Sequence, residues 1–288
     1  EEGEYYLSND ISLSANWDVP GETVLCLNGH NVDLNTYHFE VGKGEHLVIC
    51  DCSTAVHQGY LNPERYYLWT PGEGSGESCD LTGGVIYGGV SAQGYIGSCI
   101  NSQGGDVTLA GGNIAGNLHV NEANVNESNM NGAVYVYDGD FTMYGGSVTG
   151  NYSRSQGGGV HVTGKESNKS QIKLYGGEIS HNIADYFAGG IYVGNNCDFL
   201  LDGAAIEYNT AGLTRSDAFA GGIYITGAYN TATISSGRVC YNTCKGSGAG
   251  LYLDGSGYAD REFFKMTGGL IKGNSVDNAY VPPPGAQS

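Results

Sequence analysis

An 11-residue pattern that ends in Asn recurs six times and limits what this chain can fold into. In each copy an alternating apolar stretch meets a turn containing Gly, an apolar residue follows, and an Asn closes the copy. The copies are "VTLAGGNIAGN", "FTMYGGSVTGN", "IKLYGGEISHN", "FLLDGAAIEYN", "ATISSGRVCYN" and "FKMTGGLIKGN", ending at Asn117, Asn151, Asn182, Asn209, Asn242 and Asn274. Their spacings of 34, 31, 27, 33 and 32 residues indicate stacked supersecondary units.

A second motif lies between the copies. It reads "GAVYV" at 132–136, "GGVHV" at 158–162, "GGIYV" at 189–193, "GGIYI" at 221–225 and "AGLYL" at 249–253. Each unit therefore has about three short strands, and strand alternation places Phe141, Met143 and Val148 on one face. No run has the 3.6-residue apolar period of a helix. The sequence predicts an all-β, right-handed parallel β-helix.

The predicted organisation is a single β-helix domain over residues 1–280. Residues 79–280 carry the regular repeats, whose weaker first copy "CDLTGGVIYGG" has Gly89 in place of the Asn. Residues 1–78 read as N-terminal capping coils, because an open end exposes core and strand edges, with an excursion at 59–78. Aligning Cys26 with Cys50 gives a 24-residue step, so the two thiols stack or cross-link. Residues 281–288 read as a Pro-rich linker.

The charge excludes some partners. Twelve Lys and Arg against 30 Asp and Glu give a net charge of −18, and no basic cluster is available to neutralise nucleic-acid phosphates. Anionic polyuronates are disfavoured for the same reason. A neutral glycan or a host or bacterial surface protein is the expected partner. No apolar run reaches the ~18 residues needed to span a bilayer, so no membrane insertion is expected.

Eight cysteines are compatible with an oxidising, extracellular compartment. The Cys50-x-Cys52 and Cys240-x3-Cys244 spacings match no zinc pattern. We expect buried or stacked cysteines with one or two bridges, no metal and no cofactor.

The paired motifs resemble known surface repeats. An apolar residue three positions before Asn, followed by Gly-Gly and alternating apolar residues, is similar to the GGAI/FxxN repeats of chlamydial polymorphic membrane proteins. The opening "YYLSNDISLSANWDVPGETVLCLNGHNVDL" resembles β-helix repeat proteins on the surface of Gram-positive gut bacteria. The resemblance covers roughly residues 5–275. It implies the fold and an extracellular or cell-wall-anchored location, whereas such repeats serve adhesins and carbohydrate-active enzymes alike.

The terminal Asn of each copy is interpreted as architecture. We expect it to turn inward and to hydrogen-bond the Asn of the next coil, which satisfies polar groups at the bend. The Gly pair permits a turn that a β-carbon obstructs.

An outward aromatic stripe is the predicted binding surface. The middle residue of each second motif points away from the core, and coils about 4.8 Å apart align these side chains. Neighbouring loops add three more rings. The candidate ligand-binding residues are Tyr135, His161, Tyr192, Tyr224, Tyr252, Tyr186, Phe187 and Phe219. Rings of this kind suit sugar faces or protein partners, or they stack only to stabilise the sheet.

Enzymatic activity is the alternative. The chain lacks G-x-S-x-G, H-E-x-x-H and P-loop motifs. Its best carboxylate pair, Glu178 and Glu207, lies on adjacent coils with an offset of two residues, which matches the roughly 8 Å separation of inverting glycosidases. The favoured function is an adhesion or glycan-binding module without a catalytic residue. The alternative is a glycoside hydrolase or lyase on the same fold.

Overall fold

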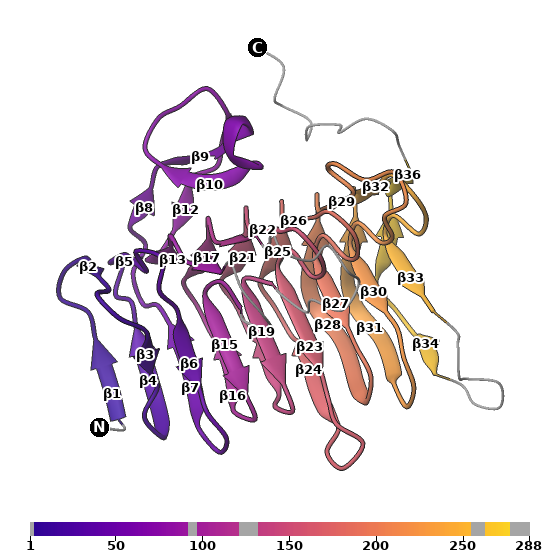
Figure 1. Cartoon of the computed structure of the whole chain (residues 1–288), viewed down its shortest axis with the longest axis horizontal. Coiled ribbons are helices and arrows are strands. Elements are labelled where there is room, and N and C mark those ends of the chain that lie inside the picture. The colour runs from indigo at the N-terminus through magenta and orange to yellow at the C-terminus, as the bar shows by residue number, and fades with distance from the viewer. Residues whose placement is uncertain (1–2, 92–96, 121–131, 255–262, 277–288) are drawn as a thin grey trace.

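The computed structural model describes residues 3–91, 97–120, 132–254 and 263–276. It confirms the fold prediction, because the chain forms an all-β parallel solenoid (Figure 1). Strands at equivalent positions of successive coils pair in parallel and build four rows along the molecule. The predicted linker 281–288 lies outside the described residues.

The first two rows come from the two halves of the Asn-terminated motif. Row 1 contains β1 (Gly3–Tyr6), β4 (Glu22–Cys26), β7 (His46–Cys50), β16 (Asp106–Leu109), β20 (Phe141–Met143), β24 (Ser170–Leu174) and β34 (Phe264–Met266). Row 2 contains β2 (Ile11–Ser12), β5 (Val32–Asp33), β13 (Val85–Tyr87), β17 (Asn113–Ala115), β21 (Ser147–Thr149), β25 (Glu178–Ser180) and β35 (Leu270–Lys272). The long strands β28 (Cys197–Glu207) and β31 (Thr231–Cys240) run through both rows and join them into one 16-stranded sheet.

The other two rows follow the ladder Asn. Row 3 contains two-residue strands: β14 (Val90–Ser91), β18 (Leu118–His119), β22 (Tyr152–Ser153), β26 (Ile183–Ala184), β29 (Thr210–Ala211), β32 (Thr243–Cys244) and β36 (Ser275–Val276). Row 4 carries the second motif: β3 (Trp17–Asp18), β6 (Phe39–Val41), β15 (Ile100–Gln103), β19 (Val134–Tyr137), β23 (Val160–Thr163), β27 (Ile191–Val193), β30 (Ile223–Ile225) and β33 (Leu251–Leu253). The sequence predicts about three strands per coil and does not predict row 3. A strand of two residues is too short to show an alternation of apolar and polar residues.

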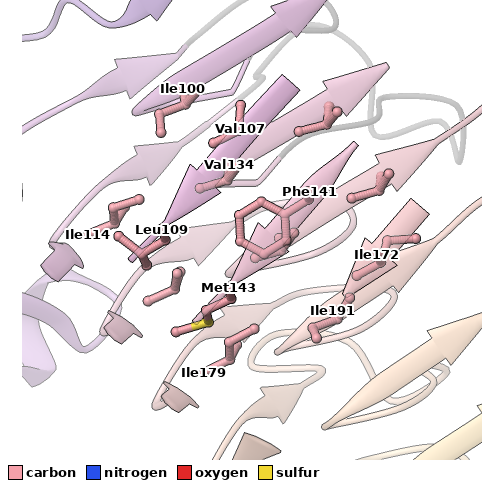
Figure 2. Close-up of a cluster of buried hydrophobic side chains, with 14 of the residues drawn as sticks. Ile100, Val107, Leu109, Ile114, Val134, Phe141, Met143, Ile172, Ile179 and Ile191 are labelled. Carbon is pink, nitrogen blue, oxygen red and sulfur yellow. The ribbon is translucent and has the colours of Figure 1, made fainter. Parts of the chain in front are cut away.

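One continuous core fills the interior of the coils. Strand alternation in each copy of the repeat predicts an interior column of Phe141, Ile172, Phe199 and Phe264, and the register confirms this order, with Ala232 in the intervening coil. It predicts a second interior column of Met143, Leu174, Leu201, Ile234 and Met266. The register confirms this order as well, but Met266, in the last described coil, is 42% exposed and not interior. Figure 2 shows labelled side chains from rows 1, 2 and 4 meeting in this interior. Burial of these apolar faces is the main driving force for the fold.

The predicted Asn ladder is present and continuous from Asn117 to Asn274. In each step the backbone N–H and the side-chain Nδ2 of one Asn both donate to Oδ1 of the next Asn, with donor–acceptor distances of 2.9–3.2 Å. Nδ2 also donates to a carbonyl of the preceding coil, for example from Asn182 to Val148 at 2.8 Å. Gly89 occupies the equivalent place in the first copy, and its N–H donates to Asn117 Oδ1.

The N-terminal coils share this register. Val24 pairs with Val48 and Cys26 with Cys50, as the 24-residue step predicts. The two thiols stack without a cross-link, and all eight cysteines, which lie in the described ranges, are free. The expected one or two bridges are therefore not formed. Five of the cysteines are buried instead: Cys26, Cys99, Cys197, Cys240 and Cys244.

An antiparallel excursion, defined here as residues 56–82, interrupts the coils (Figure 1). It contains β8 (Val56–His57), β9 (Gly59–Asn62), the short 3-10 helix η1 (Pro63–Arg65), β10 (Leu68–Pro71), β11 (Glu77–Ser78) and β12 (Leu81–Thr82). Its centre docks on the bends beside the Asn ladder. The N–H of Trp69 donates to the carbonyl of Gly150 at 2.9 Å, and Tyr66 stacks on Tyr152 at 4.3 Å.

Glycine permits this docking. Gly150 has a φ of +59°, and a β-carbon on it would lie 2.8 Å from Cβ of Trp69, which is closer than real contacts allow. The residue before the ladder Asn is left-handed in every coil from Gly116 onward. At three later coils it is aromatic, and the φ values there are 55°, 55° and 56° for His181, Tyr208 and Tyr241. At those coils the excursion does not approach the backbone as closely as it does at Gly150, so a β-carbon is tolerated.

The ladder makes a quantitative prediction. Asn182→Ala leaves the N–H and Nδ2 of Asn151 without their acceptor, so we expect a loss of about 1–3 kcal/mol of unfolding free energy. Denaturant unfolding of the parent and variant measures this loss.

The control is Asn168→Ala, because Asn168 lies in a hairpin outside the ladder and its Nδ2 donates a solvent-exposed hydrogen bond to Asp138 at 3.3 Å, which contributes little to stability. Asn196 also lies outside the ladder, but it is a less suitable control. Its φ is +54°, so an Ala substitution there would add backbone strain. Equal losses at Asn182 and Asn168 would contradict the ladder.

Candidate functional site

The predicted aromatic column exists in the expected register. Tyr135, His161, Tyr192, Tyr224 and Tyr252 follow one another on β19, β23, β27, β30 and β33. The rings of His161 and Tyr192 stack at 4.4 Å, those of Tyr192 and Tyr224 at 5.4 Å, and those of Tyr224 and Tyr252 at 5.2 Å. Their strand neighbours point into the main core, so the outward direction of these rings is confirmed.

The expected exposure of this column is wrong. Tyr135 is 2%, His161 0%, Tyr192 9% and Tyr224 7% exposed, and only Tyr252 is half-buried. The loops that lead into row 4 fold back over the rings. Buried rings cannot stack on a glycan without a movement of these loops, so the column acts as a second, outer core.

The three loop aromatics form part of that cover. Phe187 and Phe219 pair as an isolated bridge, and Phe187 packs 4.8 Å from Tyr224. Tyr186 contacts Phe187 at 3.9 Å and lies under the guanidinium of Arg215 at 4.3 Å. The sequence placed all three beside the column; Phe187 and Phe219 cover it, and Tyr186 packs on Phe187.

A different surface is hollowed. The outer face of row 2 forms an open cavity of about 510 Å³, here called the row 2 groove. The end of the excursion supplies one wall with Asp80, Leu81 and Thr82. Successive coils supply the floor, which consists of Asn113, Gly146, Ser147, Gly177, Glu178, Gly203, Ala205 and Arg238. A second cavity of about 330 Å³ lies within the excursion and shares Asp80 with the groove.

The polar floor of the groove is partly fixed by hydrogen bonds. Nδ2 of Asn113 donates to the carbonyl of Thr82 at 2.9 Å, and the hydroxyl of Ser147 donates to Oδ1 of Asn113 at 2.7 Å. Asp80 Oδ1 accepts the N–H of Gly59 at 3.2 Å. The bond from Asn113 to Thr82 connects the floor to the wall, and the other two hold the floor and the excursion in place.

The two candidate catalytic carboxylates have different environments. Their register offset of two residues is as expected, since Glu178 pairs with Ala205 and Ser180 with Glu207. Glu207 is 8% exposed and accepts two hydrogen bonds from Arg238, at 2.6 Å from Nε and 3.1 Å from Nη2. This bidentate pairing raises the pKa of Arg238 and occupies both oxygens of Glu207. Glu207 is therefore a structural ion-pair partner of Arg238.

Glu178 lines the groove as a half-buried carboxylate. It makes no side-chain hydrogen bond or ion pair with any residue that the structure describes. Burial raises the pKa of the nearby Cys79 thiol to about 12, and the charges of Glu77, Glu178 and Asp80 contribute to that rise. The negative charges of these three carboxylates therefore lie close to Cys79, where the excursion meets the coils.

Stacked aromatic rings precede and follow the groove residues of row 2 along the chain, and the first stack is the more exposed. Tyr144 and Tyr175 are 60% and 38% exposed, stack at 5.3 Å, and each precede a groove glycine by two residues. In the second stack Tyr208 packs on His181 and on Tyr241, at 5.3 Å in both cases. Burial and the neighbouring Glu207 raise the pKa of Tyr208.

The sequence interpretation missed Asp80, Arg238 and these tyrosines. A signal was available for the stacks, because Tyr144 and Tyr175 share one position of the repeat and Tyr208 and Tyr241 another. For Asp80 there was none, since its place depends on how the excursion docks.

Comparisons with known proteins do not narrow the function. No protein-family model matches the chain, and neither the curated proteins nor the solved structures give a match. In the described ranges no helix is long and apolar enough to cross a membrane. The same ranges hold no group of three or more His, Cys, Asp or Glu that could bind a metal ion.

Buried histidines make the stability pH-dependent. His161 and His119 are 0% exposed, and their ring nitrogens have no hydrogen-bond partner among the described residues. Burial lowers the pKa of His161 to about 3 and that of His119 to about 4. The unfolded chain, with a His pKa of about 6.5, takes up protons first as the pH falls. Stability is therefore complete above about pH 6.5 and decreases progressively towards about pH 3.

We expect His161→Phe to reduce this pH dependence. The variant keeps a ring in the stack and removes one group that the folded state cannot protonate, so at about pH 4 it should be more stable than the parent by on the order of a few kcal/mol. Melting curves between about pH 7 and pH 4 measure this. The control is His30→Phe, because His30 is half-exposed and lies 3.4 Å from Asp10. An unchanged pH slope in His161→Phe would contradict the assignment.

Proposed function

We propose that this chain is a glycan-binding module of a secreted or cell-wall-anchored surface protein, and that the row 2 groove binds the glycan. The observation that carries the proposal is the open cavity of about 510 Å³ with the stacked, exposed rings of Tyr144 and Tyr175 beside it. Tyrosine rings offer an apolar face and a polar edge, which suits sugars.

The geometry favours an extended chain as ligand. The groove floor crosses several coils of row 2, from Asn113 to Arg238. Coils are about 4.8 Å apart, close to the length of one sugar unit in an extended glycan. Hydroxyl, amide and carboxylate groups on the floor match the hydrogen-bonding groups of sugars.

The surface location rests on the resemblance to bacterial surface repeats. The net charge of −18 agrees with an exposed, soluble solenoid. Binding through shallow, repeated contacts is weak for one site and gains strength when several copies meet a polymer. Adhesion is the role that such binding serves.

The test is a glycan array followed by titration of any ligand found. Tyr144→Ala combined with Tyr175→Ala removes one stack, and each exposed ring contributes on the order of 1 kcal/mol. We expect affinity to fall roughly ten- to thirty-fold, with a nearly unchanged melting temperature because both rings are exposed.

Tyr6→Ala is the matched control. Tyr6 is 64% exposed and lies on the first coil, away from the groove. Equal losses of affinity in Tyr6→Ala and the double variant would contradict the proposed site. Release of sugars from a glycan, abolished by Glu178→Gln, would instead indicate the hydrolase or lyase.

A further inference from the structure

The charges of the row 2 groove select among glycans. Among the described residues that line it, Asp80 and Glu178 are acidic and Arg238 is the one basic residue. Arg238 is held by Glu207 through two hydrogen bonds, so its charge is already matched. The groove therefore presents excess negative charge at its floor and wall.

Glu178 is the charged residue of the groove floor that has no close partner among the described residues. Its carboxylate is half-buried on the groove floor and makes no hydrogen bond or ion pair within the described part of the chain. A partly desolvated carboxylate is stabilised by a cation within about 4 Å more than by a neutral donor. Arg238 cannot serve both carboxylates fully, because its fork is aligned on Glu207.

The wall adds a second carboxylate. Asp80 is exposed, and its Oδ1 accepts the N–H of Gly59 and the hydroxyl of Ser78, at 3.2 Å and 3.5 Å. Its other oxygen has no partner among the described residues. A ligand in the groove thus meets carboxylates from two directions, one on the excursion and one on β25.

We infer that the groove selects glycans that carry free, protonated amino groups, with Glu178 on the floor and Asp80 on the wall as the ion-pair partners of the amines. The inference rests on the proposed glycan-binding function and names its ligand class. An ammonium group donates three hydrogen bonds and satisfies a carboxylate that a hydroxyl satisfies less well. Exposed tyrosine faces also attract cations.

Ligands of other classes fit the row 2 groove less well. A uronic-acid chain places like charges beside Glu178 and Asp80, and the net charge of −18 repels it at long range. A neutral glycan adds no positive charge next to the Glu178 carboxylate, which then interacts only at longer range with Arg238. A basic polypeptide matches the charge, but the regular coil spacing and paired rings suit a periodic sugar chain better.

The experiment compares two probes that differ only at the amine. Titration calorimetry is carried out with the hexasaccharide of β-1,4-linked glucosamine and with its N-acetylated counterpart, at about pH 6, where the amines are largely protonated. We expect the free-amine probe to bind about ten-fold more tightly or better, and this preference to decrease at high salt.

Glu178→Gln should abolish the preference, and Asp80→Asn should reduce it. Glu166→Gln is the matched control, because it removes the same charge from an exposed hairpin outside the groove. Melting temperatures of all variants verify that they are folded.

Each outcome is decisive. Equal binding of both probes by the parent would overturn the charge selection and leave the glycan-binding function in place. Equal effects of Glu178→Gln and Glu166→Gln would overturn the assignment to Glu178. Binding of neither probe, nor of any arrayed glycan, would overturn the proposed function itself. Tighter binding of oligolysine, in competition with the free-amine probe, would replace the glycan with a basic polypeptide.

Discussion

The Asn ladder is the interaction on which the rest of the structure depends. Each ladder Asn gives two hydrogen bonds to the next, at a bend where backbone groups would otherwise be buried without partners. The ladder keeps one register although the intervening loops differ in length, since the spacing between ladder residues varies from 27 to 34. Loops are therefore free to vary, and the outer faces of the coils are held in alignment.

The ladder and its flanking apolar positions are why so much of the fold could be predicted. An alternation of two residues assigns Leu174 and Phe141 to the interior, and the repeated Asn aligns the coils, so the pairing Phe141–Ile172–Phe199 follows. The loops carry no such rule. Phe187 and Phe219 were placed beside the aromatic column correctly, but whether they lie beside or over Tyr192 depends on loop conformation that alternation does not encode.

One backbone position permits the excursion to pack closely on the outside of the solenoid. The residue before the ladder Asn is left-handed, a conformation that Gly adopts freely and that costs other residues on the order of 1 kcal/mol. Gly150 accepts both the conformation and the close approach of Trp69. Tyr208 and Tyr241 adopt the same left-handed conformation in spite of its cost, and their rings stack on each other. Strain of this kind is commonly kept at functional sites.

The contrast between the two aromatic stacks separates structure from function. Tyr192 and Tyr224 stack under a cover of apolar loop residues, where the rings contribute buried area and order a parallel sheet. Tyr144 and Tyr175 stack with most of the Tyr144 ring in water and no apolar cover, so they contribute little to burial. Exposed rings lose hydration on binding a ligand and gain contact area with it, whereas covered rings have already done so on folding. An exposed stack near a carboxylate that has no close partner among the described residues still has interaction capacity directed outward, and for this reason we place the proposed binding site in the row 2 groove.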